Sequence, residues 1–301
     1  MGDRPLSLTW FGCTTFRVEV GGRTLFFDTY MDRPPGVPEV GMSASEVTDA
    51  DLVFISHAHF DHMLGADTIA NATGATVVGS HETMRVLRDN GVPDEQLLRV
   101  SGGEPVDCGG GVTVRVYPSL HSCLFGSPSS PDTHTECLGD LGISAQDRSA
   151  SAAAIFELLR QVLPGAGPWL AETAHRCSTH DGGQLSYLLE TPDGSIFVSA
   201  SAGGWTGLLR DLRPDVAILA LAGRPNVDGE PFQGSLASFL LQEVELLKPS
   251  TVVLCHHDAL LPPILPAIDT EHALATLARE AGHATHVDLT YGDPVAILPR
   301  R

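Results

Sequence analysis

Long apolar runs are absent from this sequence, since no window holds the roughly 20 apolar residues that a membrane-spanning helix needs. The opening residues, MGDRPLSLTWFGCTTF, also lack a basic flank followed by an apolar stretch, which is the pattern of a secretory signal. We therefore predict a cytoplasmic protein that has no membrane partner.

Basic residues are few, with 18 Lys and Arg against 37 Asp and Glu and a formal net charge of −19. Binding to a phosphate backbone depends on clustered Lys and Arg that release counterions, so this balance argues against nucleic acid as a partner. A small-molecule substrate is the expected partner. The oligomeric state stays open.

C-x-x-C pairs are absent, and the wide spacing of the six cysteines argues against both a zinc ribbon and a redox dithiol. We predict reduced thiols. Cys255 stands beside His256 at a predicted strand end, where a reactive thiol and a buried structural thiol both fit. The six are Cys13, Cys108, Cys123, Cys137, Cys177 and Cys255.

Strand patterns begin early in the chain. Two β-type runs at 15–20 and 23–28 are joined by Gly21-Gly22, a pair that permits the positive φ angles of a tight hairpin. The apolar run 51–56 predicts a buried strand followed by a polar loop. Further strands are predicted at 76–79, 112–118, 184–190, 195–200, 215–221 and 251–255.

Apolar residues at three- and four-residue spacing predict one helix over 236–247 and another that ends before Gly282. Hairpins followed by alternating strands and helices suggest two sheets packed between helices. The chain has 301 residues and 43% hydrophobic composition, enough to bury a large core. We predict a single α/β (α+β) domain over 1–301.

Residues 122–182 interrupt this alternation with a stretch rich in Ser, Pro, Gly and His, and we interpret the stretch as an insertion. Within it, Ile155, Leu158, Leu159 and Val162 mark one amphipathic helix. So long an excursion is more often a functional lid than a plain connection, although a packed excursion without such a role also fits.

The segment S-H-A-H-F-D-H, residues 56–62, holds three histidines and one aspartate directly after a predicted buried strand. Alternation at the strand end sends His57 and His59 to one side, and a helix start turns Asp61 and His62 toward a neighbouring point. One loop can therefore serve two adjacent metal positions. The alternative is a surface histidine cluster that binds nothing.

Two further histidines follow other predicted strands. His121 comes after VTVRVYPSL and His256 comes after TVVLC. Both stand where a strand passes into a loop at the carboxyl edge of a sheet, which is the usual location of sites in α/β architectures.

Together, the H-x-H-x-D-H string, the later His121 and the closing KPSTVVLCHHD resemble the metallo-β-lactamase fold superfamily over nearly the whole chain. The opening WFGCTTFRVEVGGRTLFFDTY is similar to the branch of ascorbate-phosphate-lactonase-like hydrolases, in which an aspartate such as Asp28 ends the third strand. The resemblance implies an αββα sandwich with a partly helical insertion.

Carried over by position, the resemblance assigns the first metal to His57, His59 and His121. It assigns the second metal to Asp61, His62 and His256. Either His256 or the adjacent His257 could be the ligand at this position. The H-[HY]-D pattern of the family places its ligand first, so we favour His256 as the ligand and His257 as a supporting residue.

One departure from the family pattern stands at Ser201, where members usually present a metal-bridging aspartate. A hydroxyl is a poor substitute for a bridging carboxylate, so one or two ions are expected to bind. Ser201 can equally be a plain turn residue. With only Asp61 as an anionic ligand, two divalent ions would leave a positive site that favours an anionic substrate.

The implied activity is metal-dependent hydrolysis, in which a metal-bound hydroxide attacks an ester, lactone, phosphoester or amide. Asp61 is the predicted catalytic residue because it can orient the hydroxide or accept its proton. Zinc is the favoured ion, and iron and manganese suit the same donors. A redox enzyme and a non-catalytic binding protein are the alternatives.

Other residues near the predicted site have weaker assignments. Asp28, Ser199 and Trp205 can line or brace it, although packing roles are favoured for each. The acid for the leaving group is not evident, and its candidates by residue type alone are His81, His134, His175 and His180.

Overall fold

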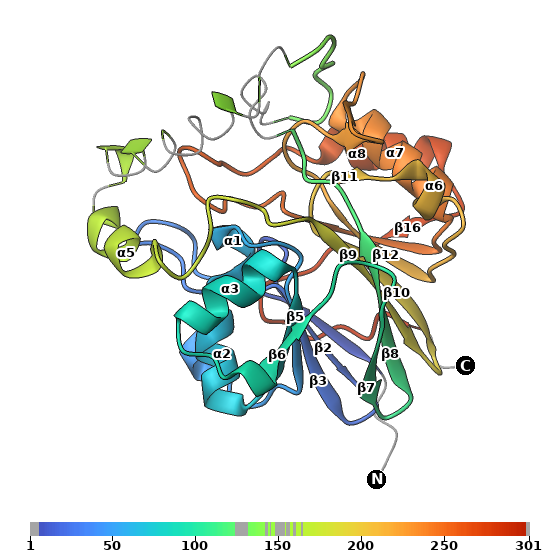
Figure 1. Cartoon of the computed structure of the whole chain (residues 1–301). Helices are drawn as coiled ribbons and strands as arrows, with labels where there is room; N and C mark the ends of the chain where they lie inside the picture. The colour runs from blue at the N-terminus through green and yellow to red at the C-terminus, as the bar shows by residue number, and fades with distance from the viewer. Residues whose placement is uncertain are drawn as a thin grey trace.

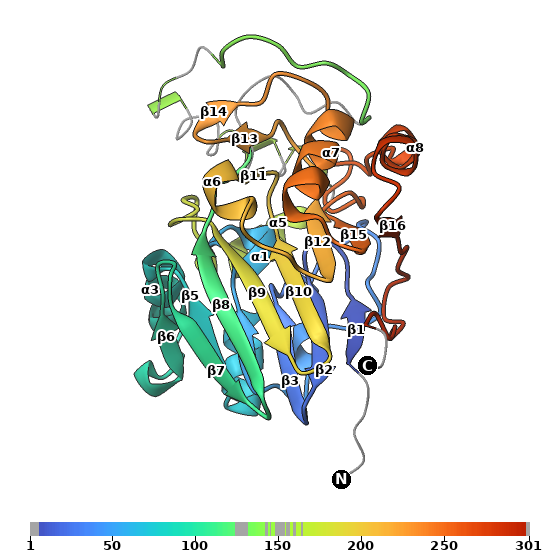
Figure 2. The same cartoon turned by 90° about the vertical axis from the view of Figure 1, so that its right-hand side faces the viewer.

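Two β-sheets form the centre of the structure (Figure 1). It is a computed structural model, and it describes residues 6–123, 132–141, 144, 146–147, 154, 157–158, 161–163 and 165–298. The sheets lie face to face, with helices packed on the outer side of each (Figure 2). This arrangement is the αββα sandwich that the sequence predicted.

The first sheet contains six strands in chain order. Its first three strands are antiparallel and the rest add in parallel. The strands are β1 (Ser7–Trp10), β2 (Phe16–Val20), β3 (Arg23–Phe27), β4 (Leu52–Phe54), β5 (Thr76–Gly79) and β6 (Leu97–Arg99).

The second sheet contains seven strands in the order β16-β15-β12-β10-β9-β8-β7. The pairs from β16 to β10 are parallel and those from β10 to β7 are antiparallel. The strands are β7 (Pro105–Gly109), β8 (Val112–Pro118), β9 (Leu185–Thr191), β10 (Gly194–Ser199), β12 (Val216–Ala220), β15 (Thr251–Cys255) and β16 (Thr285–His286). A small third sheet joins β11 (Gly203–Gly204), β13 (Asn226–Val227) and β14 (Glu230–Pro231).

The predicted strands are confirmed to within a residue or two at each end, and the predicted hairpin joins β2 to β3. Its turn residues Gly21 and Gly22 have φ angles of 58° and 74°, in the left-handed region that glycine adopts without steric cost. The sequence analysis did not predict the edge strands β1 and β6 of the first sheet, the edge strands β7 and β16 of the second, or the strands of the small third sheet.

Apolar side chains from the facing sides of both sheets form the central core, with Phe27 and Phe54 from the first sheet against Tyr187 from the second. Helices α1 to α3 cover the outer face of the first sheet, and α6 to α8 cover that of the second (Figures 1 and 2). The helical segments are η1 (Ala44–Glu46), α1 (Phe60–Met63), α2 (Ala66–Thr73), α3 (His81–Asp89), η2 (Asp94–Gln96), α5 (Ala166–Thr173), α6 (Thr206–Leu209), α7 (Leu236–Leu247) and α8 (Glu271–Glu280). The two helices predicted over 236–247 and before Gly282 are therefore present, as α7 and α8.

Part of the predicted insertion lies outside the described residues, including Ile155 and Leu159 of its predicted helix. Its described end packs on the body of the protein. Leu170 of α5 joins an apolar cluster with Tyr30 and Leu260, and Trp169 Nε1 donates to the backbone oxygen of Asp32 at 3.0 Å. Whether the insertion acts as a lid stays a prediction.

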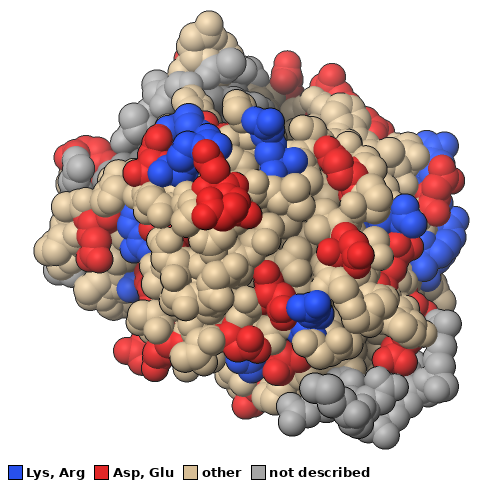
Figure 3. Space-filling model, turned by 60° about the horizontal axis from the view of Figure 1, so that its bottom comes forward, with Lys and Arg blue, Asp and Glu red and all other residues tan. Residues whose placement is uncertain are grey.

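In the part of the chain that the structure describes, no helix is both long enough and apolar enough to cross a membrane. The face shown in Figure 3 carries basic side chains scattered among acidic ones, and they do not gather into a single patch there.

Strand direction decides where the polar loops meet. Strands β1, β3 and β4 run in the same direction in the first sheet, and β8, β10 and β15 do so in the second. The strands β3, β8 and β10 end at the same edge of the sandwich (Figures 1 and 2). The loops that follow these strands carry the residues singled out from the sequence.

Candidate metal centre

A first group of donors contains only histidines. One ring nitrogen from each of His57, His59 and His121 lies within 4.8 Å of the others. His57 is fully buried, and the other two rings are partly exposed. The loops after β4 and β8 thus bring together residues that are about sixty positions apart.

Local backbone geometry separates the histidines of the 56–62 segment. His59, with φ −71° and ψ 158°, is in an extended conformation and is the N-cap of α1. The amide of Ala58 donates to the backbone oxygen of Asp181 at 2.9 Å, which fixes the loop between the two ligand candidates. His57 and His59 therefore point to the first group, and the α1 residues Asp61 and His62 belong to the second.

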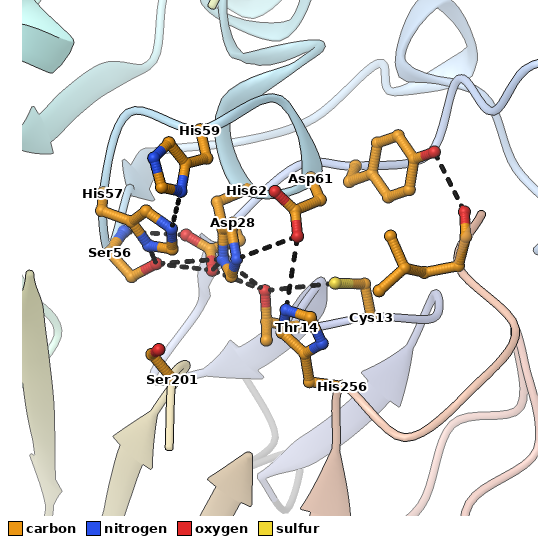
Figure 4. A network of polar contacts seen from close by, with 12 residues as sticks. Cys13, Thr14, Asp28, Ser56, His57, His59, Asp61, His62, Ser201 and His256 are labelled. Carbon is orange, nitrogen blue, oxygen red and sulfur yellow. Dashed lines mark hydrogen bonds and ion pairs between the residues drawn. The ribbon is translucent and has the colours of Figure 1, made fainter. Parts of the chain in front are cut away.

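A second group combines different donor types. One ligand atom from each of Cys13, Asp61, His62 and His256 lies within 4.8 Å of the others. Oδ2 of Asp61 lies 3.3 Å from Nε2 of His256 and 3.5 Å from Nε2 of His62 (Figure 4). The two groups are adjacent, because the ring centroids of His57 and His62 are 3.8 Å apart.

A buried polar network contacts Nδ1 of His62, the ring nitrogen that does not face Asp61 (Figure 4). Oδ2 of Asp28 lies 2.8 Å from Nδ1 of His62, and it accepts hydrogen bonds from the hydroxyls of Thr14 at 2.6 Å and Ser56 at 2.9 Å. The other oxygen of Asp28 accepts from the amide of Ser56 at 2.8 Å. Asp28 therefore braces the site, as the sequence analysis allowed, and leaves Nε2 of His62 facing Asp61.

Charge differs between the two groups. Burial lowers the pKa of His57 well below its ordinary value, lowers that of His59, and lowers that of His121 to about 3. In the second group burial acts in the same direction, but Asp61 and Asp28 raise the pKa of His62 to about 10. The first group therefore consists of neutral imidazoles, while the second attracts positive charge.

The donors fit a divalent cation. Nε2 of His57 and Nδ1 of His59 face each other at 3.1 Å, and neutral imidazoles that converge with His121 offer lone pairs to one point. A three-histidine set with partly exposed rings is the arrangement of a metal site that keeps an open position. In the second group a carboxylate, a thiol and two imidazoles supply donors that zinc accepts.

The two adjacent histidines after β15 have different surroundings. His256 belongs to the second group, whereas His257 lies outside both groups and stacks on Trp10 with ring centroids 5.3 Å apart. The assignment of His256 rather than His257 as the ligand stays a prediction.

Ser201 supports the loop that carries His121. Its hydroxyl accepts a hydrogen bond from the amide of Ser122 at 3.0 Å, and the Ser199 hydroxyl donates to the Ser201 backbone oxygen at 3.3 Å. Trp205, the N-cap of α6, is 38% exposed.

None of the four histidines considered as leaving-group acids belongs to either donor group. His180 precedes Asp181, whose backbone oxygen accepts a hydrogen bond from the amide of Ala58 at 2.9 Å. The four side chains, His81, His134, His175 and His180, are exposed.

The sequence analysis missed Cys13. It considered Cys255 as a reactive thiol instead. Cys255 belongs to the central core, and its buried Sγ donates to the backbone oxygen of Ser199 at 3.9 Å. Cys13 lies instead among the second group of donors. Its only sequence signal is the W-F-G-C-T-T loop after a strand that was itself not predicted.

Comparison with known proteins supports this architecture. Residues 23–140 match the model of the beta-lactamase superfamily domain. A solved structure of Igni18, described as a metallo hydrolase from Ignicoccus hospitalis, superposes with a TM-score of 0.60 over 97% of this chain and 98% of that one, at 20% identity. This chain has a metallo-β-lactamase fold.

Other similar proteins carry different descriptions. A UPF0173 metal-dependent hydrolase from Pyrobaculum arsenaticum is 35% identical over 126 residues, which cover 41% of this chain and 54% of the relative. The chain spans about half the length of the curated relatives that it matches first. CmlA, a diiron β-hydroxylase from Streptomyces venezuelae, superposes with a TM-score of 0.59 over 100% of this chain and 55% of that one, at 16% identity.

Proposed function

We propose that this chain is a metal-dependent hydrolase of the metallo-β-lactamase superfamily. The observation that carries the proposal is the convergence of two adjacent donor groups at one edge of the sandwich, one of neutral imidazoles and one containing a carboxylate. The description of the Pyrobaculum relative as a metal-dependent hydrolase supports the same activity.

We assign His57, His59 and His121 to the first metal and Asp61, His62 and His256 to the second. Zinc is the favoured ion because it accepts imidazole and carboxylate donors in tetrahedral sites with an open position. A divalent ion bound here would lower the pKa of a bound water and polarise a carbonyl or phosphoryl oxygen of the substrate.

Asp61 has a role beyond ligation in this proposal. Burial raises the pKa of its carboxyl, but His62 and His256 hold that pKa well below its usual range, so the group is ionised near neutral pH. An ionised carboxylate accepts hydrogen bonds and can orient the attacking water. Its Oδ2 atom is the one that lies nearest to both imidazoles.

A small, anionic substrate fits this site best. The net charge of −19 disfavours polymers of like charge, while the metal ions would attract an anionic group of a small molecule. Ester, lactone, phosphoester and amide bonds are all open to the same chemistry, and the lactonase-like branch suggested by the opening strands stays a prediction.

Iron chemistry is the second candidate. The diiron β-hydroxylase CmlA has a similar fold, and imidazole and carboxylate ligands bind iron as well as zinc. Identification of the metal separates the two candidates, since a hydrolase does not need a redox-active ion.

The decisive experiment is elemental analysis of protein purified without added metal, beside His57→Ala and Asp61→Ala variants and an exposed control, His283→Ala. We expect about two equivalents of zinc in the wild type and the control, with losses in both site variants. One equivalent would indicate a mononuclear site, and iron would favour the redox enzyme. A folded protein that binds no metal would contradict the proposal.

Activity is tested on a panel of lactones, phosphodiesters, thioesters and amides. Hydrolysis that disappears in His57→Ala would support the enzyme. Full metal occupancy without hydrolysis of any panel member would instead favour a binding protein that kept its histidines and lost turnover.

A further inference from the structure

Cys13 occupies an unexpected place in the second donor group. It lies in the loop between β1 and β2, and its side chain is fully buried beside Asp61, His62 and His256 (Figure 4). The hydroxyl of Thr14, which donates to Asp28 in the network behind His62, lies 4.0 Å from Sγ.

The backbone of Cys13 is fastened to the turn that carries His256. Its amide donates to both carboxylate oxygens of Asp258, at 3.0 and 3.1 Å, and its carbonyl accepts from the amide of His256 at 2.9 Å. Asp258 is held in turn by Arg33 and Tyr291, each at 2.7 Å. The thiol and the His256 imidazole are therefore positioned relative to each other by direct backbone contacts.

Both residues also share an unusual conformation. Cys13 has a φ of 47° and His256 a φ of 61°, values in the left-handed region that residues with a Cβ rarely adopt. Asp28, which braces His62, has a φ of 52°. Three of the five non-glycine residues with positive φ in the described part of the chain thus belong to or support this donor group.

We propose that the Cys13 thiolate is a ligand of the second metal and supplies the anionic donor that Ser201 does not. The inference rests on the proposed function, because it requires a metal in the second group. On binding, the S–H bond breaks, the sulfur–metal bond forms and the proton passes to solvent.

This assignment changes the chemistry expected of the site. A thiolate is a soft ligand that favours zinc over manganese. With Cys13 and Asp61 both anionic, a divalent ion in the second group is neutralised by its own ligands. The attraction for an anionic substrate then comes mainly from the first metal, which is bound by neutral imidazoles.

The competing explanation is that Cys13 is simply a buried thiol. It also belongs to the apolar cluster that contains Tyr30, Leu64 and Leu260. A packing role would tolerate alanine or serine without any change at the metal, so the readout must report the sulfur–metal bond itself.

The test uses the wild-type chain loaded with Co²⁺, for which a thiolate ligand gives a near-ultraviolet charge-transfer absorption. Cys13→Ser and Cys13→Ala are compared with Cys108→Ala, a matched control because Cys108 is buried in the central core outside the donor groups. We expect the absorption in the wild type and the control and its loss in both Cys13 variants. The affinity of those variants for the second metal should fall by at least the roughly 10- to 100-fold that loss of a supporting residue costs.

X-ray absorption of the zinc-loaded wild type keeps the test independent of how the variants fold. A sulfur scatterer at about 2.3 Å from zinc supports the proposal. The Cys13 proposal would be overturned if two metals bound without such a scatterer, or if the charge-transfer band survived in a folded Cys13 variant. Either result would leave the hydrolase proposal intact. A wild type that binds no metal would overturn both.

Discussion

Asp28 and His62 form a carboxylate–imidazole pair in which Oδ2 of Asp28 lies 2.8 Å from Nδ1 of His62. Both side chains are almost fully buried. The contact selects the tautomer of His62 and directs its other nitrogen toward Asp61, an arrangement that strengthens imidazole as a metal ligand.

Asp28→Asn removes that carboxylate and keeps the size of the side chain. We expect the affinity for the second metal to fall 10- to 100-fold, since supporting residues of metal ligands have effects of this size. Metal titration against a competing chelator measures the change. Asp89→Asn, in an exposed ion pair with Arg85, is the control, and equal affinities in the two variants would contradict the role of Asp28.

The two histidines after β15 should respond differently to truncation. His256→Ala is expected to remove the second metal, because this side chain lies 3.3 Å from Asp61 in the donor group. His257→Ala should keep the metal and lose about 1 kcal/mol of the free energy of unfolding, since its contact with Trp10 is ring stacking. Metal analysis with urea unfolding separates the two effects, and metal loss in His257→Ala alone would reverse the assignment.

Stability of the metal-free protein should depend on pH in two opposite ways. His62 has a pKa of about 10 in the folded state, above its unfolded value of about 6.5. Its contribution to the free energy of unfolding is therefore complete below about pH 6.5 and is lost as the pH rises toward 10. His121, with a pKa of about 3, destabilises the fold as the pH falls from 6.5 toward 3, because the unfolded chain binds a proton that the folded state excludes.

Urea unfolding in the presence of a chelator should therefore give the highest free energy of unfolding near neutral pH. His62→Gln should flatten the alkaline side and leave the acidic side unchanged. If wild type and variant lose stability equally between pH 7 and 10, the pKa of His62 is not raised in the folded state.

Metal binding should show the same contrast. The second metal must displace protons from His62 and His256, whose pKa values are raised, and from the Cys13 thiol, so its affinity is expected to rise steeply with pH, by up to about tenfold per unit for each proton displaced. The first metal meets neutral imidazoles, and its affinity should be nearly constant above pH 6. Chelator competition at several pH values checks both, and identical pH slopes for the two ions would contradict the difference in charge.

Ser201→Ala should act through the His121 loop. It removes the hydroxyl that accepts from the Ser122 amide, so the free energy of unfolding is expected to fall by about 1–3 kcal/mol. The affinity for the first metal should fall, and the affinity for the second should stay the same. Thermal unfolding and metal titration measure these effects. Selective loss of the second metal would show instead that Ser201 takes the place of the bridging aspartate.

Much of the fold could be predicted because its signals are local. Alternating apolar residues specified the β2–β3 hairpin, and three- and four-residue spacing specified α7 and α8. The short edge strands β1 and β6, of four and three residues, escaped prediction because so few residues give no clear alternation. The H-x-H-x-D-H segment was recognisable for a similar reason, since its donors are close in sequence.

By itself the sequence determined the two-sheet architecture and four donors of one short loop. Only the tertiary structure decided which distant side chains join them: it added Cys13 from the β1–β2 loop, placed His256 beside Asp61, and gave Asp28 its contact with His62. The physical reason is that strands from both sheets end at one edge, so residues with no sequence spacing in common meet where their loops converge.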